Sequence, residues 1–317
     1  MNVLILEAVG MYGRELYQLL PAFILGVALA ATIKTFKWDL RLRAYMRDSG
    51  AATIPLAVVL GVFSPLCACG VLPIVIPLAV SGVPLPPLLA LLATSPLMSP
   101  DALTITWAGL GPALAWTKIF SAVGMGFLVG GVTYVLEKRS NFSNDIVRIK
   151  PVFEEDGSLA SAYDIACANE ITVPTMVVRP RDSKVLFFLD RARDTSWFVG
   201  KFLLLAVALQ VVLELAVPMD AIRFIAGESG VTSLLWAAIL GAPLPAHQVP
   251  VVPITRGSLD LGMDPGAAAT FLVAGPVTSI PALLVLWKIF ERRLFFLYLG
   301  LCLTGAVATG LIFRLVM

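Results

Sequence analysis

Two cysteines separated by a single alanine are the residues of this chain best suited to chemistry. Cys67 and Cys69 lie between two apolar runs. Thiolates are soft ligands that select soft, thiophilic species. Two thiols at this spacing can face one ligand only where the backbone is not helical, and the neighbouring Pro65 and Gly70 favour such a break. The alternative is that each cysteine is a small apolar filler of a membrane helix.

The only histidine of the chain, His247, lies 180 positions after Cys67. An imidazole can bind a metal ion or carry a proton, and an ionisable group at membrane depth is a functional candidate by default. The alternative is that His247 only forms a hydrogen bond with a neighbouring helix. If the two regions face each other, His247 and Gln248 lie opposite Cys67 and Cys69.

Polar side chains also surround a second pair of proline-rich breaks. This group comprises Thr94, Ser95, Met98, Ser99, Asp101, Thr278 and Ser279. Hydroxyls can recap broken helix ends, which is the role expected of Ser99 and Ser279. Asp101 is either an N-cap or a carboxylate that couples transport to protons, a role for which His247 is the other candidate. The candidate substrate-binding residues are Cys67, Cys69, His247, Gln248, Met98, Ser99, Thr278 and Ser279.

These residues belong to a stretch that occurs twice. A shift of 180 positions lays Gly61–Trp107 on Gly241–Trp287 without a gap. Aliphatic matches mean little in an apolar sequence, but three prolines, two glycines and a tryptophan keep the same offset. The sequence therefore predicts two homologous halves. The helix-breaking residues expected in the two copies are Pro65, Gly70, Pro73, Pro96, Pro100, Pro245, Pro253, Pro276 and Pro281.

Helix breaks inside apolar segments are typical of a transporter. Proline removes a backbone donor and clashes with the preceding turn. Open backbone at membrane depth survives only where it is buried in protein or lines a cavity. Broken hydrophobic segments at matching places in two halves are the best indication in a sequence of a transporter's binding site.

The composition is that of a polytopic membrane protein. Hydrophobic residues make up 58% of the chain and charged residues 14%, whereas soluble domains carry about 25% charged residues. The mean hydropathy is +0.90. The net charge of +2 gives no reason to expect nucleic acid as a partner. The four cysteines do not suggest a disulfide framework, because three of them lie in or beside apolar segments.

About eight hydrophobic segments follow one another, and the expected fold is an all-α polytopic membrane protein. Residues 1–136 form the first membrane repeat and residues 195–317 the second. Residues 137–194 hold most of the charge and are expected to be a soluble, cytoplasmic linker region. The side chain of Lys118 is expected to snorkel to the membrane surface. The segments are 16–33, 52–81, 83–110, 113–136, 196–217, 231–257, 262–287 and 294–314.

The distribution of basic residues bears on how the segments cross the membrane. If all eight segments cross, loop 34–50 and the central region lie on opposite sides, and one of these basic regions breaks the positive-inside tendency. If 52–81 and 231–257 are instead re-entrant, each half crosses three times and the halves are inverted. Loop 34–50, the central region and loop 288–293 then all lie in the cytoplasm. This arrangement satisfies every loop and favours inverted repeats in a bacterial-type inner membrane.

Motifs in both halves resemble a known family. The stretches Cys69–Pro73 and Ser95–Pro100, with Gly262–Ala268 and Phe271–Pro276, are similar to signatures of the predicted permease family that includes the organoarsenical efflux permeases (ArsP-type). The resemblance implies a multi-pass permease that exports small molecules. In the characterised members these are trivalent organoarsenicals bound through cysteine thiols. Cys67 and Cys69 match the cysteine region of the motif, whereas His247 stands where family members often have a cysteine.

The favoured function is therefore export of a small thiophilic solute, with trivalent organoarsenicals as the sharpest version. No phosphate-binding loop of the Gly-x-x-x-x-Gly-Lys-Ser/Thr type occurs, so an ion gradient is expected to drive transport. Alternative substrates are low-molecular-weight thiols, other sulfur species and soft metal ions. An integral-membrane enzyme is a further alternative, but one histidine and scattered carboxylates argue against it.

The expected partners are the small-molecule substrate and the lipid bilayer. We expect no cofactor, no catalytic residue and no resident metal. The sequence leaves open whether the chain forms a homo-oligomer.

Overall fold

The described part of the chain is helical. The computed structural model describes residues 2–35, 50–64, 66, 68–80, 83–139, 231–241, 248–260, 262–279 and 290–316, with a few more between 193 and 208 and between 283 and 287. No strand occurs among these residues. The predicted all-α class is therefore confirmed for this part of the chain.

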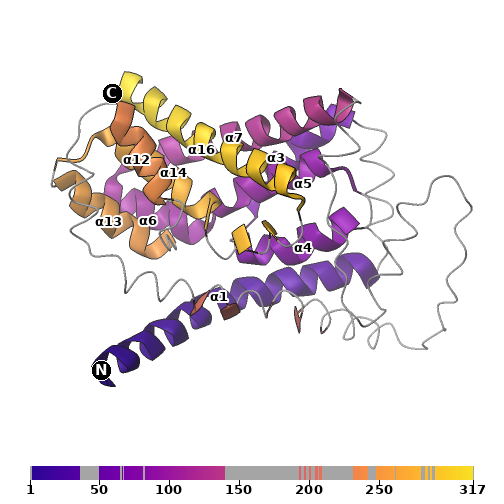
Figure 1. Cartoon of the computed structure of the whole chain (residues 1–317), viewed down its shortest axis with the longest axis horizontal. Helices are drawn as coiled ribbons and strands as arrows, with labels where there is room; N and C mark the ends of the chain where they lie inside the picture. The colour runs from indigo at the N-terminus through magenta and orange to yellow at the C-terminus, as the bar shows by residue number, and fades with distance from the viewer. Residues whose placement is uncertain are drawn as a thin grey trace, which may run out of the picture.

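One long helix and two groups of shorter ones make up the architecture (Figure 1). The long N-terminal helix α1 packs against α4 and contains the expected span 16–33. The described elements are α1 Asn2–Thr35, η1 Gly50–Ala52, α3 Thr53–Phe63, α4 Ala68–Val80, α5 Leu85–Thr94, η2 Ser95–Leu97, α6 Pro100–Leu110, α7 Pro112–Lys138, α12 Val231–Gly241, α13 Gln248–Asp260, α14 Pro265–Val277 and α16 Arg292–Val316.

Three of the described helices begin on a proline. Pro100, Pro112 and Pro265 are the first residues of α6, α7 and α14. The first helical position suits proline because its amide would have no partner there and its φ is already helical. The turn between α6 and α7 passes through Gly111, whose φ of +88° disfavours residues with a side chain.

Three of the expected helix breaks lie inside helices instead. Gly70 and Pro73 lie in α4, and Pro253 lies in α13. Each proline is in the second turn of its helix, so it removes a single hydrogen bond near the helix start and does not end the helix. The first break lies just before α4, where α3 ends at Phe63 and Ser64 turns extended with ψ 122°.

The remaining expected breaks differ in how the structure describes them. Pro96 lies in η2, and Pro276 lies in the last turn of α14. Pro65, Pro245 and Pro281 lie outside the described residues.

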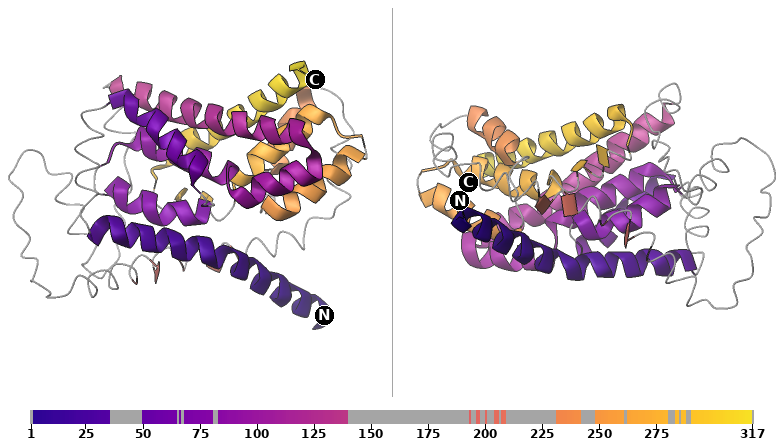
Figure 2. Two further views of the ribbon diagram at one scale, coloured as in Figure 1. Left: turned by 180° about the vertical axis from the view of Figure 1, so that it is seen from behind. Right: turned by 60° about the horizontal axis from the view of Figure 1, so that its bottom comes forward.

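Equivalent helices in the two halves begin at the same offset. The starts of α13, α14 and α16 follow those of α4, α5 and α7 by 180 positions. The packing is matched as well: α3 lies against α5 and α5 against α7, just as α12 lies against α14 and α14 against α16. Figure 2 shows the two groups from two further directions.

Two glycines show the same correspondence in atomic detail. A side chain at Gly130 would meet atoms of Ile54, Ala90 and Pro86. A side chain at Gly310, 180 positions later, would meet atoms whose residues are each 180 positions after those three. These are Leu234, Thr270 and Gly266.

The two longest helices of the second and first groups, α16 and α7, cross each other in opposite directions (Figures 1 and 2). Where they cross, a side chain at Gly305 would collide with the sulfur of Met125. Gly305 is itself 180 positions after Met125. Residues 180 positions apart in the sequence therefore meet at this crossing.

Two described helices are long and apolar enough to cross a membrane by length and composition, Pro112–Lys138 and Arg292–Val316. Three shorter apolar helices accompany them, Gly50–Phe63, Leu85–Leu97 and Pro265–Val277. A single crossing needs about 20 residues, so none of these shorter helices spans a bilayer alone.

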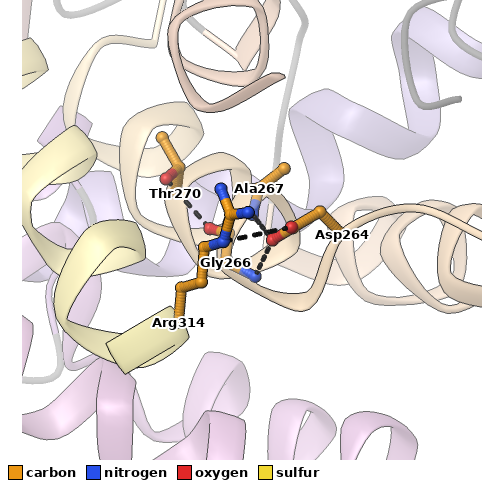
Figure 3. A network of polar contacts seen from close by, with 5 residues as sticks. All are labelled: Asp264, Gly266, Ala267, Thr270 and Arg314. Atoms are coloured by element: carbon orange, nitrogen blue, oxygen red, sulfur yellow. Dashed lines mark hydrogen bonds and ion pairs between the residues drawn. The ribbon is translucent and has the colours of Figure 1, made fainter. Parts of the chain in front are cut away.

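A capped helix start anchors the second half and gives a first prediction (Figure 3). The carboxylate of Asp264 accepts hydrogen bonds from the amides of Gly266 (2.7 Å) and Ala267 (3.3 Å) at the start of α14. Its other oxygen lies 3.7 Å from Nε of Arg314 on α16.

Asp264→Ala should lower the stability of the fold by about 1–2 kcal/mol, because an N-cap is lost. Thermal unfolding in detergent checks this, and Asp264→Asn, which keeps the cap, should lose less. An unchanged melting temperature for the alanine variant would contradict the prediction.

Candidate functional site

The break between α5 and α6, called the central break from here on, lies at the centre of the described helices. It consists of the single 3-10 turn η2 and the two residues that follow it. The turn contacts α3, α4, α7 and α14. Thr94, Ser95 and Leu97 are fully buried, and Met98 nearly so. Irregular backbone is thus enclosed by helices on several sides, as non-helical backbone at membrane depth requires.

The C-terminal end of α14 lies against this turn. Leu97 and Met98 belong to the same hydrophobic cluster as Val277, near the end of α14. Thr278, the residue that ends α14, is fully buried. The structure therefore brings two pairs of the expected site residues, at 98–99 and 278–279, into the same region.

A hydrogen bond connects the break before α4 to the central break. The hydroxyl of Ser95 in η2 donates to the carbonyl oxygen of Leu66 at 2.7 Å, in a buried environment. Leu66 immediately precedes Cys67 and is itself buried. Leu66, the residue before Cys67 in the sequence, is therefore held beside the central break.

The threonine hydroxyls beside the break form hydrogen bonds to backbone carbonyls of their own helices. Thr94 donates to the carbonyl oxygen of Ala90 at 2.8 Å, and Thr278 donates to that of Ala274 at 2.7 Å. Such bonds to the preceding turn are common for threonine in helices. Each hydroxyl oxygen still has acceptor capacity for a bound solute.

Ser99 does not cap α6 in the way expected from the sequence. It is the N-cap residue, and its carbonyl accepts from the amide of Leu103 at 3.1 Å, but its side chain makes no capping hydrogen bond. The side chain is only 8% exposed. Ser279 likewise starts a helical turn through its carbonyl, which accepts from the amide of Leu283 at 3.0 Å. Ser99 therefore retains a buried hydroxyl beside the central break.

The other expected site residues are described less fully. Cys69, Gln248 and Asp101 lie in the first turns of α4, α13 and α6, and the structure describes their backbone only. Cys67 and His247 lie outside the described residues. Their roles in binding and proton coupling stay predictions.

A buried lysine was missed by the sequence analysis. Lys118 was expected to snorkel, but its side chain is 1% exposed, and Nζ donates to the hydroxyl of Thr106 on α6 at 3.3 Å. The sequence shows only that the lysine lies within an apolar helix. It does not show that α6 covers this face of α7. The position of a lone cation inside a long apolar segment was the available signal.

An apolar groove lies on another face of the same crossing. It has a volume of about 530 Å³ and runs between α7 and α16. Trp116 and Phe120 contribute to its wall, together with Ile312 and Val316. Trp116 and Phe120 are exposed and stacked, with ring centroids 6.0 Å apart. The lining of the groove is mainly apolar, whereas the central break carries buried polar side chains.

Comparison with known proteins agrees with the sequence motifs. The chain matches the family described as "Predicted permease" over residues 5–315. It is 24% identical over 299 residues to UPF0718 protein YcgR of Bacillus subtilis, covering 94% of each chain. It is 21% identical over 305 residues to the "Putative two-component membrane permease complex subunit" of Streptococcus mutans, covering 93% of this chain and 91% of the relative. No solved structure matches the chain. The resemblance seen in the motifs is thus confirmed, and the chain belongs to the predicted permease family, a family of membrane transport proteins.

Proposed function

We propose that this protein exports a small thiophilic solute across the membrane by ion-gradient-driven transport, with trivalent organoarsenicals as the substrate. The observation that carries the proposal is the buried hydrogen bond from Ser95 to Leu66. This bond fixes Leu66, and the proposal places the thiols of Cys67 and Cys69, which follow it in the sequence, at the same break. Soft thiol ligands, enclosed irregular backbone and membership of a permease family together fit a binding site for a soft solute.

The buried polar groups at the central break complete the proposed site. Ser99 supplies a hydroxyl without a capping partner, and Met98 supplies a polarisable thioether. Thr278 adds acceptor capacity from the second half. A trivalent organoarsenical has both a thiophilic centre and an apolar substituent, so thiols and an apolar wall suit it together.

The two halves are proposed to be inverted repeats. The offset of 180 positions between equivalent helix starts supports this, as does the meeting of Met125 with Gly305 on oppositely directed helices. A two-fold axis that relates opposite directions of crossing lies in the membrane plane. Residues 1–136 and 195–317 are then the two membrane halves in an inner membrane, joined by the 137–194 region.

A second substrate class has one observation in its favour. His247 takes the repeat position of Cys67, so a site shared between the halves would combine thiols with an imidazole. This donor set suits soft and borderline metal ions such as copper and zinc. Low-molecular-weight thiols and other sulfur species remain within the same proposal of a thiophilic solute.

Uptake of methylarsenite by everted membrane vesicles tests the proposed function. Vesicles from cells that express the protein are compared with vesicles from cells that lack it, with an acidic interior and with no gradient. Native vesicles are used because one relative is named as a subunit of a two-component complex, and a partner subunit would be present in them. Inorganic arsenite is the control solute.

Gradient-dependent accumulation of methylarsenite alone is the expected result. Failure of folded protein to accumulate it would overturn the organoarsenical assignment and leave the sulfur and metal substrates to be assayed in the same way. Equal accumulation of both arsenicals would contradict the expected need for an apolar substituent.

A further inference from the structure

Lys118 lies in the middle of the described helices. Its side chain is 1% exposed. Leu114, one turn before it on α7, belongs to one hydrophobic cluster, and Ala122, one turn after it, belongs to another. Lys118 therefore lies between residues of the two apolar clusters along α7. Removing such a charge from water costs several kcal/mol of free energy, and this cost must be offset.

The repeat indicates that packing alone does not require a charge at this position. The residue 180 positions after Lys118 is Tyr298, which is also 1% exposed. The residue 180 positions after its partner Thr106 is Leu286, again 1% exposed. Neutral side chains thus fill the corresponding space in the second half. The first half carries a lysine and a hydroxyl where the positions 180 residues later carry a phenol and an alkyl group.

Few other charges are available on the elements packed against α7. Those elements are α3, α5, η2, α6, α14 and α16. In their described ranges, α3, α5, η2 and α14 contain no charged residue, and the only acidic residue is Asp101, five positions before Thr106 on α6. The other ionisable residues on these elements and on α7 itself are Tyr134, Glu137, Lys138, Arg292, Arg293, Tyr298, Cys302 and Arg314. Apart from Tyr298 and Cys302, which are buried in one of the apolar clusters, they lie at or near helix ends.

We propose that Lys118 is the residue that carries the proton in the transport cycle. This inference rests on the proposed function. The sequence suggested Asp101 and His247 as candidates for proton coupling, and the inference assigns this role to Lys118 instead. A lysine can hold and release a proton, and the hydroxyl of Thr106 can serve both forms. Its oxygen accepts a hydrogen bond from the ammonium, and a hydroxyl can also act as a donor. In each cycle Lys118 takes one proton from the outer solution and releases it to the cytoplasm as one solute leaves.

Three variants separate proton coupling from folding. Lys118→Met keeps an unbranched side chain without a titratable group, and Lys118→Arg keeps a charge that does not release its proton. Thr106→Val removes the hydroxyl while keeping the shape. Each is assayed in everted vesicles for accumulation of methylarsenite against an imposed proton gradient. Exchange of labelled for unlabelled methylarsenite is measured without a gradient. A pH-sensitive dye reports proton movement by the unaltered protein when solute is added.

The expected result is a loss of driven accumulation with preserved exchange. One proton per solute and a gradient of about one pH unit support accumulation of about tenfold. Both Lys118 variants should lose this accumulation and keep exchange within about twofold of wild type, which corresponds to about 0.4 kcal/mol. Thr106→Val should show weaker accumulation, and the unaltered protein should move protons when solute is added.

The inference is overturned if either Lys118 variant accumulates methylarsenite like the unaltered protein. It is also overturned if solute flux through the unaltered protein moves no protons. If neither Lys118 variant folds, Thr106→Val decides, and wild-type accumulation by that variant overturns the inference. Absence of any methylarsenite transport by the unaltered protein is a different outcome, because it removes the proposed function itself.

Discussion

Replacement of both Cys67 and Cys69 by serine is expected to abolish transport of methylarsenite. Serine keeps the size of the side chain but replaces a soft sulfur ligand with a hard hydroxyl oxygen, for which a thiophilic solute has little affinity. Accumulation in everted vesicles should fall by about tenfold or more, which corresponds to a loss of at least 1.4 kcal/mol of binding free energy. Each single substitution should give an intermediate loss if both thiols bind the same solute.

Cys302 provides a matched control in the same chain. It is buried in α16 and carries a free thiol, and it belongs to the same hydrophobic cluster as Leu97 and Met98. Cys302→Ala should leave methylarsenite transport unchanged. If the double serine variant keeps wild-type transport while it remains folded, thiol binding of the solute is wrong. If Cys302→Ala loses transport as well, the loss reflects folding rather than binding.

Adding methyl groups at Gly126 and Gly130 is expected to disrupt the packing of the first half. A side chain at Gly126 would collide with the hydroxyl of Thr94 and lie 2.7 Å from Cγ2 of Val58. A side chain at Gly130 would lie 2.8 Å from Cγ2 of Ile54. Overpacking of this kind typically costs about 1–3 kcal/mol at each site. The double alanine variant should therefore melt far below the wild type in detergent, and transport should fall because Thr94 borders the central break.

The same helix supplies the control for this prediction. A side chain at Gly124 or Gly131 would meet nothing within 4 Å. Gly124→Ala and Gly131→Ala should melt at or slightly above the wild-type temperature, because alanine favours helix over glycine by about 0.5–1 kcal/mol. Equal melting temperatures for the two double variants would contradict the close packing of α7 against α3 and α5.

The sequence predicted the position of the central break because its cause is local. Pro96 and Pro100 leave no continuous helix between α5 and α6, so the interruption could be expected without knowing the neighbours. Pro73 has the same chemistry but lies in the second turn of α4. The effect of a proline thus depends on where the helix starts, and residue type alone did not reveal the start at Ala68.

Burial of individual polar residues could not be predicted in the same way. The sequence shows that Lys118 and Ser99 lie in apolar surroundings along the chain, but not which helix covers them. α6 folds back on α7 through Gly111 and covers Lys118, and the hydroxyl of Ser99 is enclosed without capping its helix. Both outcomes depend on tertiary contacts. Periodicity and spacing do not determine such contacts.

The crossing of α7 and α16 has a consequence for how the halves can move. In the proposed arrangement of inverted halves, Met125 and Gly305 meet where equivalent positions coincide, so a rotation that exchanges the conformations of the two halves would displace this point least. Only one of the two residues has a side chain, and methionine is flexible enough to adapt its shape during such a rotation. Lys118 and Tyr298 lie seven positions from this pivot along their own helices, or about 10 Å at 1.5 Å per residue. In the proposed arrangement, a rocking motion that loosens the packing around one of them would tighten it around the other.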